Sequence, residues 1–387
     1  MSLIETLRSA VGPEGLLTGA DIGPRYLNTR GHGDAGQPLC VVRPKTTEQV
    51  SRALALCHAQ RQAVVPQGGL SGLVGGAAPR DGDVVLSLER MTAIEELDSD
   101  GRTLTAQAGV VLQTAQEHCA AAGFELPLDL GARGSATIGG VISTNAGGVR
   151  VIRYGMMRDS VLGLEAVLAD GTVLSSMNKM LKNNAGYDIK QLFIGSEGTL
   201  GIVTRAVIRL RPRPRAAVTA FAGCATFDSV VALLRHVESQ AGEGLGSFEV
   251  MWRAYDDFVR ARCPSLKPPL PAGFEFSVLL ELLGMDDARA AADMERVLES
   301  ALAANIIGDA AIAKNERERA MFWAVRENAG EGFRTLGPLC TYDVSMPIPT
   351  MGQFGERVQA EIAARFAGAT TLVLGHLGDG NLHVVAA

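Results

Sequence analysis

Glycine-rich segments dominate the first half of this chain and constrain how it can fold. The chain has 387 residues, 45 of which are glycine, and no short repeat orders these glycines as in collagen. Because glycine lets the backbone turn tightly or approach a ligand closely, clustered glycines predict ligand-binding loops. Three such segments occur, and the first and third lie beside predicted strands.

The first segment follows a short strand predicted at residues 63–65 and would present backbone N–H groups to an anion such as phosphate. It is not a P-loop, because no Gly-Lys-Ser/Thr follows it, and its glycine spacing differs from the dinucleotide-binding fingerprint. Composition alone leaves two alternatives open, a phosphate site and a mobile surface turn. The segment begins with Pro66, Gln67, Gly68, Gly69, Leu70, Ser71 and Gly72.

The second segment, residues 129–148, is too rich in Gly, Ser and Thr for a helix and too apolar for a solvated linker. Short hydroxyls and bare backbone suit a flat polar ligand, and a crossover between strands is the alternative. The third segment precedes an alternating strand pattern at 202–210, as at a bulged strand entry. The candidate ligand-binding residues of these two segments are Gly131, Ala132, Arg133, Gly134, Ser135, Ala136, Thr137, Thr144, Asn145, Ala146, Gly147, Glu197, Gly198, Thr199, Leu200, Gly201, Ile202 and Val203.

A Pro/Arg-rich stretch at 211–215 cannot continue a central strand and predicts a domain boundary. We therefore expect domains at 1–213 and 214–387. The second domain is expected to be α+β, with a sheet covered on one side by helices. Its predicted helices span 227–238, 286–301, 316–332 and 351–366, and its predicted strands span 217–222, 275–282, 340–345 and 371–374.

Two motifs of the second domain carry candidate chemistry. His376 and His383 flank a tight turn, and two imidazoles closing on one ion are plausible metal ligands, although two ligands alone are too few. Arg326 follows Trp323 on a predicted helix, where it is either solvated, paired within its helix, or functional. Asn381 either forms the turn or orients a ligand.

Taken together, the three glycine-rich segments resemble the FAD-binding domain of the vanillyl-alcohol oxidase and p-cresol methylhydroxylase flavoprotein family. The resemblance covers essentially the whole chain and extends to Arg158, Asp159 and residues 182–188. It implies an α+β fold in which an FAD-binding domain of two subdomains is followed by an α+β cap domain. It also implies that 66–72 holds the pyrophosphate, that 131–137 and 144–147 line the flavin and ribityl, and that 197–203 contacts the adenosine end.

The paired-histidine motif is similar to that of the D-2-hydroxyacid branch of this family, which includes D-2-hydroxyglutarate and D-lactate dehydrogenases and the glycolate oxidase flavin subunit. The resemblance implies oxidation of a D-2-hydroxy acid to a 2-oxo acid, with hydride transfer to flavin N5. It further implies that His376 and His383 bind a divalent metal, often zinc, which lowers the pKa of the substrate hydroxyl. Arg326 would clamp the substrate carboxylate.

The sequence departs from this branch in two respects. The chain stops four residues after His383, so the second domain is expected to be C-terminally incomplete, without the Glu ligand and the His base of its relatives. Gly330 and Thr341 stand where enzymes for dicarboxylic substrates have Thr and Lys. We therefore favour a D-2-hydroxy acid in general. A non-catalytic FAD-binding subunit and an oxygen-using flavin alcohol oxidase remain alternatives.

Charge and cysteine distribution limit the partners and the compartment. The net charge of −6 argues against nucleic acid, and no apolar run approaches the roughly 20 residues of a membrane span. The six cysteines are scattered, which predicts small buried residues in a reducing compartment. With no secretory signal at the N-terminus, we expect a cytoplasmic protein. An electron-transfer flavoprotein or a quinone is a candidate electron acceptor, and a homodimer is a candidate assembly.

Overall fold

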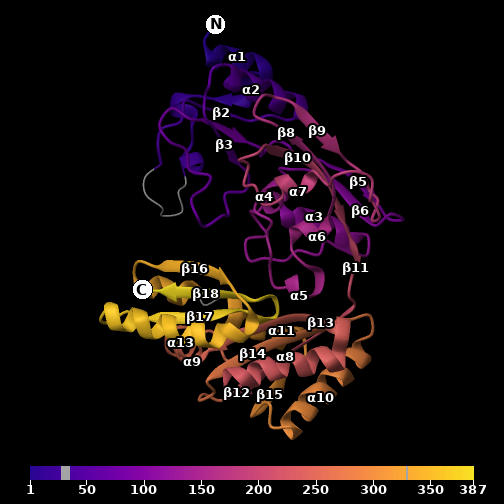
Figure 1. The fold of residues 1–387 in the computed structure, drawn as a ribbon, viewed down its shortest axis with the longest axis vertical. Helices are drawn as coiled ribbons and strands as arrows, with labels where there is room; N and C mark the ends of the chain where they lie inside the picture. Colours follow the sequence, from indigo (N-terminus) through magenta and orange to yellow (C-terminus); the bar gives the residue numbers. More distant parts are fainter. Residues whose placement is uncertain (28–34, 328–329) are drawn as a thin grey trace. The chain divides into compact units, whose positions relative to one another are not determined.

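The computed structural model describes residues 1–27, 35–327 and 330–387, which form two compact units (Figure 1). The first unit consists of residues 1–148 and 154–213. The second consists of residues 214–387 together with the five-residue segment 149–153. A short piece from the middle of the expected first domain therefore belongs to the second unit.

The first unit begins with a four-stranded sheet of order β1-β2-β4-β3, in which β2, β4 and β3 are parallel and β1 is antiparallel to β2. Its core joins the sheet to α1 and α2 through buried side chains such as Leu7, Val42 and Ala53. Thr46 caps α2 by accepting a hydrogen bond from the backbone N–H of Gln49. The elements are α1 (Leu3–Val11), β1 (Leu16–Leu17), β2 (Cys40–Val42), α2 (Thr47–Ala59), β3 (Val64–Gln67) and β4 (Val84–Ser87).

A five-stranded antiparallel sheet of order β5-β6-β10-β8-β9 forms the rest of this unit. A register shift between Val203 and Arg205 marks the bulged entry expected for β10. The strands are β5 (Ile94–Asp98), β6 (Thr103–Gln107), β8 (Val161–Val167), β9 (Val173–Ser176) and β10 (Ile202–Arg209), with a small pair formed by β7 (Phe124–Glu125) and β11 (Arg211–Pro212). The helices are α3 (Leu112–Ala121), α4 (Ile138–Ser143), α6 (Met157–Ser160) and α7 (Lys190–Phe193), and α5 (Val151–Tyr154) spans the boundary between the units.

The second unit is built on a seven-stranded antiparallel sheet of order β15-β12-β14-β13-β17-β18-β16. Its strands are β12 (Ala216–Cys224), β13 (Leu245–Trp252), β14 (Phe276–Gly284), β15 (Asp309–Ile312), β16 (Cys340–Ser345), β17 (Thr371–His376) and β18 (Asn381–Ala386). Its helices are α8 (Phe227–Ala241), α9 (Arg253–Arg262), α10 (Asp287–Ala303), α11 (Glu316–Glu327), α12 (Gly330–Phe333) and α13 (Ile348–Arg365).

Helices cover both faces of this sheet. Helices α8, α10 and α13 share one core with strand residues such as Val250 and Leu280, whereas α9 and α11 share another with Met251 and Leu279. The expectation of helices on one side only is therefore wrong. Its physical reason is visible in β13 and β14, whose residues are almost all buried, so neither face of the sheet is left open to solvent.

Three other expectations need correction or limitation. Residues 129–148 contain helix α4, because Ile138, Val141 and Ile142 bury an apolar face despite the surrounding Gly and Ser. Five cysteines are buried as expected, but Cys340 is exposed on the edge strand β16. Helix α11 ends at Glu327, and residues 328–329 of the helix expected at 316–332 lie outside the described residues. Among the described helices, none has the length and apolar character needed to cross a bilayer.

Candidate functional site

The three glycine-rich segments lie against one another in the first unit. A Cβ atom on Gly69 would lie 1.8 Å from the carbonyl oxygen of Ser135, so the first segment touches the second through bare backbone. The backbone N–H of Glu197 donates to the carbonyl oxygen of Ser143 at 2.8 Å, which ties the third segment to the second. Segments that are far apart in sequence therefore form one surface.

Backbone conformation and an unpaired hydroxyl indicate that this surface is suited to a polar ligand. Leu70, Asn145 and Glu197, one from each segment, adopt φ values of 54°, 47° and 51°. Such left-handed backbone costs free energy for non-glycine residues and clusters at ligand sites. The hydroxyl oxygen of Thr137 is buried and has no hydrogen-bond partner among the described residues. These features fit a nucleotide cofactor.

A cavity of about 580 Å³ lies beside the third segment. Gly198, Leu200 and Ile202 form one wall, and Leu54 and His58 of α2 contribute to another. The cavity is therefore wholly within the first unit and large enough to receive part of a nucleotide.

Four adjacent strands of the second unit carry a carboxylate, two imidazoles and another carboxylate in one row. Glu249 of β13 lies opposite His376 of β17, and Asp343 of β16 lies opposite His383 of β18. His376 Nδ1 is hydrogen-bonded to Glu249 Oε1 at 2.7 Å, and His383 Nδ1 to Asp343 Oδ1. The Nε2 atoms of the two histidines face each other at 3.2 Å. The structure thus brings together the two histidines expected from sequence.

Arg326 reaches the same row from α11. Its Nε donates a hydrogen bond to Glu249 Oε2 at 2.8 Å, and its side chain is only 9% exposed. Its Nη2 atom is buried without a hydrogen-bond partner in the described part of the chain. Arg326 is therefore not a solvated surface residue, and a carboxylate on a distant strand holds it. Sequence reasoning missed this carboxylate, Glu249, and also Asp343.

The charges in this row stabilise one another. Burial alone would raise the pKa of Glu249, but His376 and Arg326 outweigh it and hold that pKa below its ordinary value. Burial would lower the pKa of His376, but Glu249 raises that pKa above its ordinary value. The hydrogen bond from His383 lowers the pKa of Asp343.

The two imidazoles fit part of a metal site. Two histidines on a tetrahedral zinc ion, each at about 2.0–2.1 Å, would have nitrogens about 3.3 Å apart. The observed Nε2 separation of 3.2 Å agrees with this value. Over residues 1–27, 35–327 and 330–387, however, no three His, Cys, Asp or Glu side chains are grouped to hold an ion. His376 and His383 can therefore supply two ligands, and the described residues do not supply the third.

A hydrogen bond within the turn between His376 and His383 stabilises the conformation of that turn. The backbone N–H of Asn381 donates to Asp379 Oδ1 at 3.1 Å, and Gly380 has a φ of 78°. The side-chain Oδ1 of Asn381 is buried and has no hydrogen-bond partner among the described residues. Asn381 thus shapes the turn through its backbone, and its side-chain carbonyl remains able to accept a hydrogen bond.

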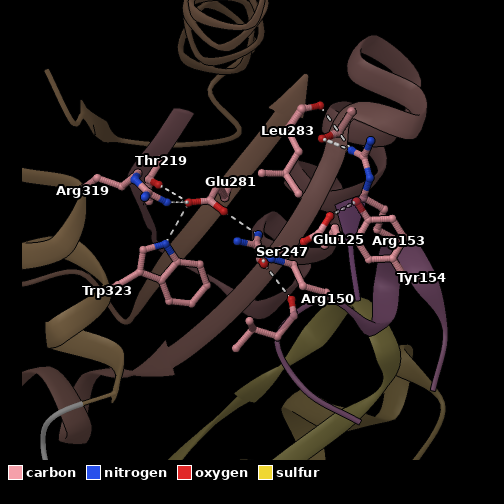
Figure 2. Close-up of polar contacts among 12 residues, drawn as sticks. Glu125, Arg150, Arg153, Tyr154, Thr219, Ser247, Glu281, Leu283, Arg319 and Trp323 are labelled. Carbon is pink, nitrogen blue, oxygen red and sulfur yellow. Dashed lines mark hydrogen bonds and ion pairs between the residues drawn. The ribbon is translucent and has the colours of Figure 1, made fainter. Parts of the chain in front are cut away.

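A second buried carboxylate, Glu281 of β14, binds a different set of partners (Figure 2). It contacts Arg150 at 2.5 Å and Arg319 at 3.4 Å, and it accepts hydrogen bonds from the Thr219 hydroxyl and the Trp323 indole N–H at 2.6 and 2.9 Å. These contacts fasten α11 and segment 149–153 to the sheet. Neither histidine of the row takes part in them.

Segment 149–153 also touches the histidine turn. A Cβ atom on Gly378 would lie 2.4 Å from Ile152 Cδ1, so the isoleucine packs directly against the turn. Arg153 donates hydrogen bonds to the carbonyl oxygens of Gly244 and Leu283 at 3.1 and 3.2 Å. The segment is therefore an integral part of the second unit.

Comparison with known proteins gives two family matches and closely related sequences. Residues 38–176 match the FAD binding domain, and residues 213–387 match the C-terminal domain of FAD linked oxidases. A mitochondrial D-2-hydroxyglutarate dehydrogenase of Bos taurus is 39% identical over 90% of this chain and 63% of its own length. A D-2-hydroxyglutarate–pyruvate transhydrogenase of Saccharomyces cerevisiae is 33% identical over 90% of this chain and 72% of its own length. The chain spans less than two thirds of several curated relatives.

A solved structure confirms the expected fold. p-Cresol methylhydroxylase with bound substrate superposes with a TM-score of 0.77 over 100% of this chain and 82% of its own chain, at 16% identity. The predicted α+β FAD-binding domain with an α+β cap is thus correct. The prediction of a cytoplasmic protein is contradicted, because the cattle protein and several other relatives are mitochondrial. Scattered cysteines indicate only a reducing compartment, which does not identify the cytoplasm.

Proposed function

Because this chain belongs to the family of FAD-linked oxidases that includes the D-2-hydroxyglutarate and D-lactate dehydrogenases, we propose that it binds FAD and oxidises a D-2-hydroxy acid to the 2-oxo acid. The observation that carries the proposal is that Arg326 and His376 bind the two oxygens of one carboxylate, that of Glu249. The guanidinium of Arg326, which can bind a carboxylate, and the imidazole of His376, which can bind a cation, are thus both hydrogen-bonded to Glu249. A 2-hydroxy acid has its carboxylate and hydroxyl on adjacent carbons and needs these two groups together.

We infer that FAD lies against the three glycine-rich segments of the first unit. Residues 66–72 would hold the pyrophosphate, 131–137 and 144–147 the flavin and ribityl, and 197–203 the adenosine end. The backbone contact of Gly69 with Ser135, the left-handed φ of Asn145 and the cavity at Leu200 support this assignment. When bound, FAD supplies the acceptor for the hydride that leaves the substrate Cα.

The residues of the second unit would orient the substrate. Arg326 would bind the substrate carboxylate through its unpaired Nη2, since the charge-assisted contact suits a guanidinium. His376 and His383 would hold a divalent cation, with zinc as the candidate, which supplies Lewis acidity at the hydroxyl. Asn381 would accept a hydrogen bond near that position through its unpaired Oδ1. The electron acceptor and the homodimer stay predictions.

Anaerobic flavin reduction tests the proposed function. The purified protein should be yellow, release its flavin on acid denaturation, and be reduced by D-lactate or D-2-hydroxyglutarate but not by the L-enantiomers. A colourless protein that takes up no added FAD contradicts the proposal. A protein that binds FAD but is reduced by no D-hydroxy acid is instead a non-catalytic subunit, and oxygen consumption with simple alcohols identifies an oxidase.

A further inference from the structure

We propose that Glu249 is a positioning residue that fixes two active groups at once, the His376 imidazole and the Arg326 guanidinium, and that Asp343 positions His383 in the same way. This inference deepens the proposed function and rests on it for the roles of His376 and Arg326. The orientations of His376, His383 and Arg326 do not depend on those roles and can be measured without substrate.

The setting of Glu249 is unusual for a residue that serves stability alone. It lies in the middle of β13, whose eight residues are all buried, and its own side chain is 1% exposed. A buried carboxylate loses its hydration and contributes less to stability than a well-packed apolar residue of similar size. Both oxygens of Glu249 are used, one by each active group. The carboxylate thus fixes the distance between His376 and Arg326.

The hydrogen bonds also fix where the ring protons lie. An ionised carboxylate only accepts hydrogen bonds, so Nδ1 of His376 and Nδ1 of His383 carry protons. When both rings are neutral, each Nε2 has a lone pair, and the two lone pairs face each other at 3.2 Å. Two facing lone pairs repel unless a proton or a metal cation lies between them. The row therefore orients both imidazoles toward one cation position before any metal binds.

The same carboxylate limits how Arg326 can act. Because Nε is occupied by Glu249, the substrate must bind at the terminal nitrogens, of which Nη2 is unpaired among the described residues. A guanidinium held at Nε loses less side-chain freedom when it binds a carboxylate. Glu249 therefore orients both Arg326, which would bind the substrate carboxylate, and His376, which would bind the cation.

The substitution Glu249→Gln gives a sharp test, because arginine can only donate. The amide oxygen of Gln must accept from Arg326 Nε, so its NH₂ group faces Nδ1 of His376 and moves the ring proton to Nε2. Nitrogen-15 NMR on histidine-labelled, FAD-loaded, chelator-treated protein at alkaline pH reads the tautomers, and only six histidines contribute signals. We expect Nδ1–H at His376 in the parent protein and Nε2–H in the variant. Calorimetric affinity for Zn²⁺ should fall about 10–100-fold.

Glu281→Gln is the matched control. Glu281 is also a fully buried glutamate bonded to arginine, on the neighbouring strand β14, but it contacts neither histidine. Its substitution should leave the His376 tautomer unchanged and the Zn²⁺ affinity within twofold, although it removes a comparable buried charge. A His376 ring that stays Nδ1–H in Glu249→Gln would overturn the proposal and make Glu249 an ordinary ion-pair partner.

Asp343→Asn keeps the test decisive if Glu249→Gln does not fold. The Asp343 side chain is 64% exposed, so the fold should tolerate the change. We expect the His383 Nδ1 resonance to shift and Zn²⁺ affinity to fall, and no change in either would overturn the proposal. The tautomers decide even where zinc binding is too weak to measure. In a further outcome, the protein shows the expected tautomers although no D-hydroxy acid reduces its flavin. That result would support the positioning role of Glu249 and refute the proposed function.

Discussion

Arg326 is the residue on which substrate recognition should depend most. We expect Arg326→Ala to weaken the apparent affinity for D-hydroxy acids by on the order of 2–5 kcal/mol, because a charge-assisted contact in a buried site is lost. The visible FAD spectrum should be unchanged, since the proposed FAD segments lie in the first unit. Stopped-flow flavin reduction measures the affinity. Arg319→Ala, on the same helix but bonded to Glu281 and Glu316, is the control. An affinity within twofold of the parent's would mean that Arg326 only supports the fold.

Asp379 should reduce stability at neutral pH. Burial raises the pKa of Asp379 to about 6, above the ordinary value of 3.8 that it regains on unfolding. The native state therefore holds the proton more tightly, and stability falls as the pH rises from about 4 to above 6. Asp379→Asn keeps an acceptor for the backbone N–H of Asn381 and removes this loss.

Chemical denaturation in the presence of chelator tests this expectation. The Asp379→Asn variant should be more stable than the parent by on the order of 2 kcal/mol at pH 8, with no difference near pH 3.5. A constant difference across this range would show that packing, and not ionisation, distinguishes the two proteins.

The sequence identified some residues of the row and not others. His376, His383 and Arg326 were predicted because their motifs are local. Glu249 and Asp343 were missed because their partners lie on other strands, and Glu249 and His376 are 127 positions apart in the sequence. The available signal was a single charge in the apolar run from Phe248 to Trp252, since an isolated charge inside a buried strand needs a partner.

Regular elements were predictable where their periodicity is strong. Helices α8, α10 and α13 lie close to the expected ranges, because their apolar residues recur at helical spacing. Strand β13 was missed because Gly246, Ser247 and Glu249 interrupt it, so that it lacks the continuous apolar run typical of a strand buried on both faces. Helix α4 was missed because it has only six residues, and packing against the sheet outweighs their weak helix propensity.

The contact between the first two glycine-rich segments should decide FAD binding. Gly69→Ala would place a methyl group 1.8 Å from the Ser135 carbonyl oxygen, so the segments must move apart. We expect purified Gly69→Ala to contain little FAD and to bind added FAD at least tenfold more weakly, as measured by flavin fluorescence. Gly72→Ala is the control, because its Cβ meets no atom within 4 Å. Equal FAD content in the two variants would argue against a cofactor site at this contact.

The stability of the second unit should depend on Arg150, which lies outside the main stretch of sequence of this unit. Arg150→Ala leaves the buried Glu281 with Arg319 as its remaining cation, so we expect unfolding of this unit to require up to about 3–5 kcal/mol less free energy. The chain's two tryptophans, Trp252 and Trp323, both lie in the second unit, so their fluorescence in apoprotein follows its unfolding.

The control for this experiment is Arg289→Ala, because Arg289 is 85% exposed and forms a long ion pair with Asp293, at 3.9 Å. Its substitution should change stability by no more than about 0.5 kcal/mol. If Arg150→Ala is equally mild, Arg319 alone is sufficient to compensate the charge of Glu281.

The exchanged segment 149–153 has a consequence for protein engineering. The backbone passes between the two units three times, at 148/149, 153/154 and 213/214. A chimera joined once at 213/214 would combine a guest cap with the host's Arg150 and Ile152, although these residues must match the guest's buried glutamate and histidine turn. Transplanting a cap between relatives therefore requires two inserts, the C-terminal half and a pentapeptide more than sixty residues upstream. A single crossover exchanges one continuous stretch of sequence, whereas the second unit consists of two separate stretches.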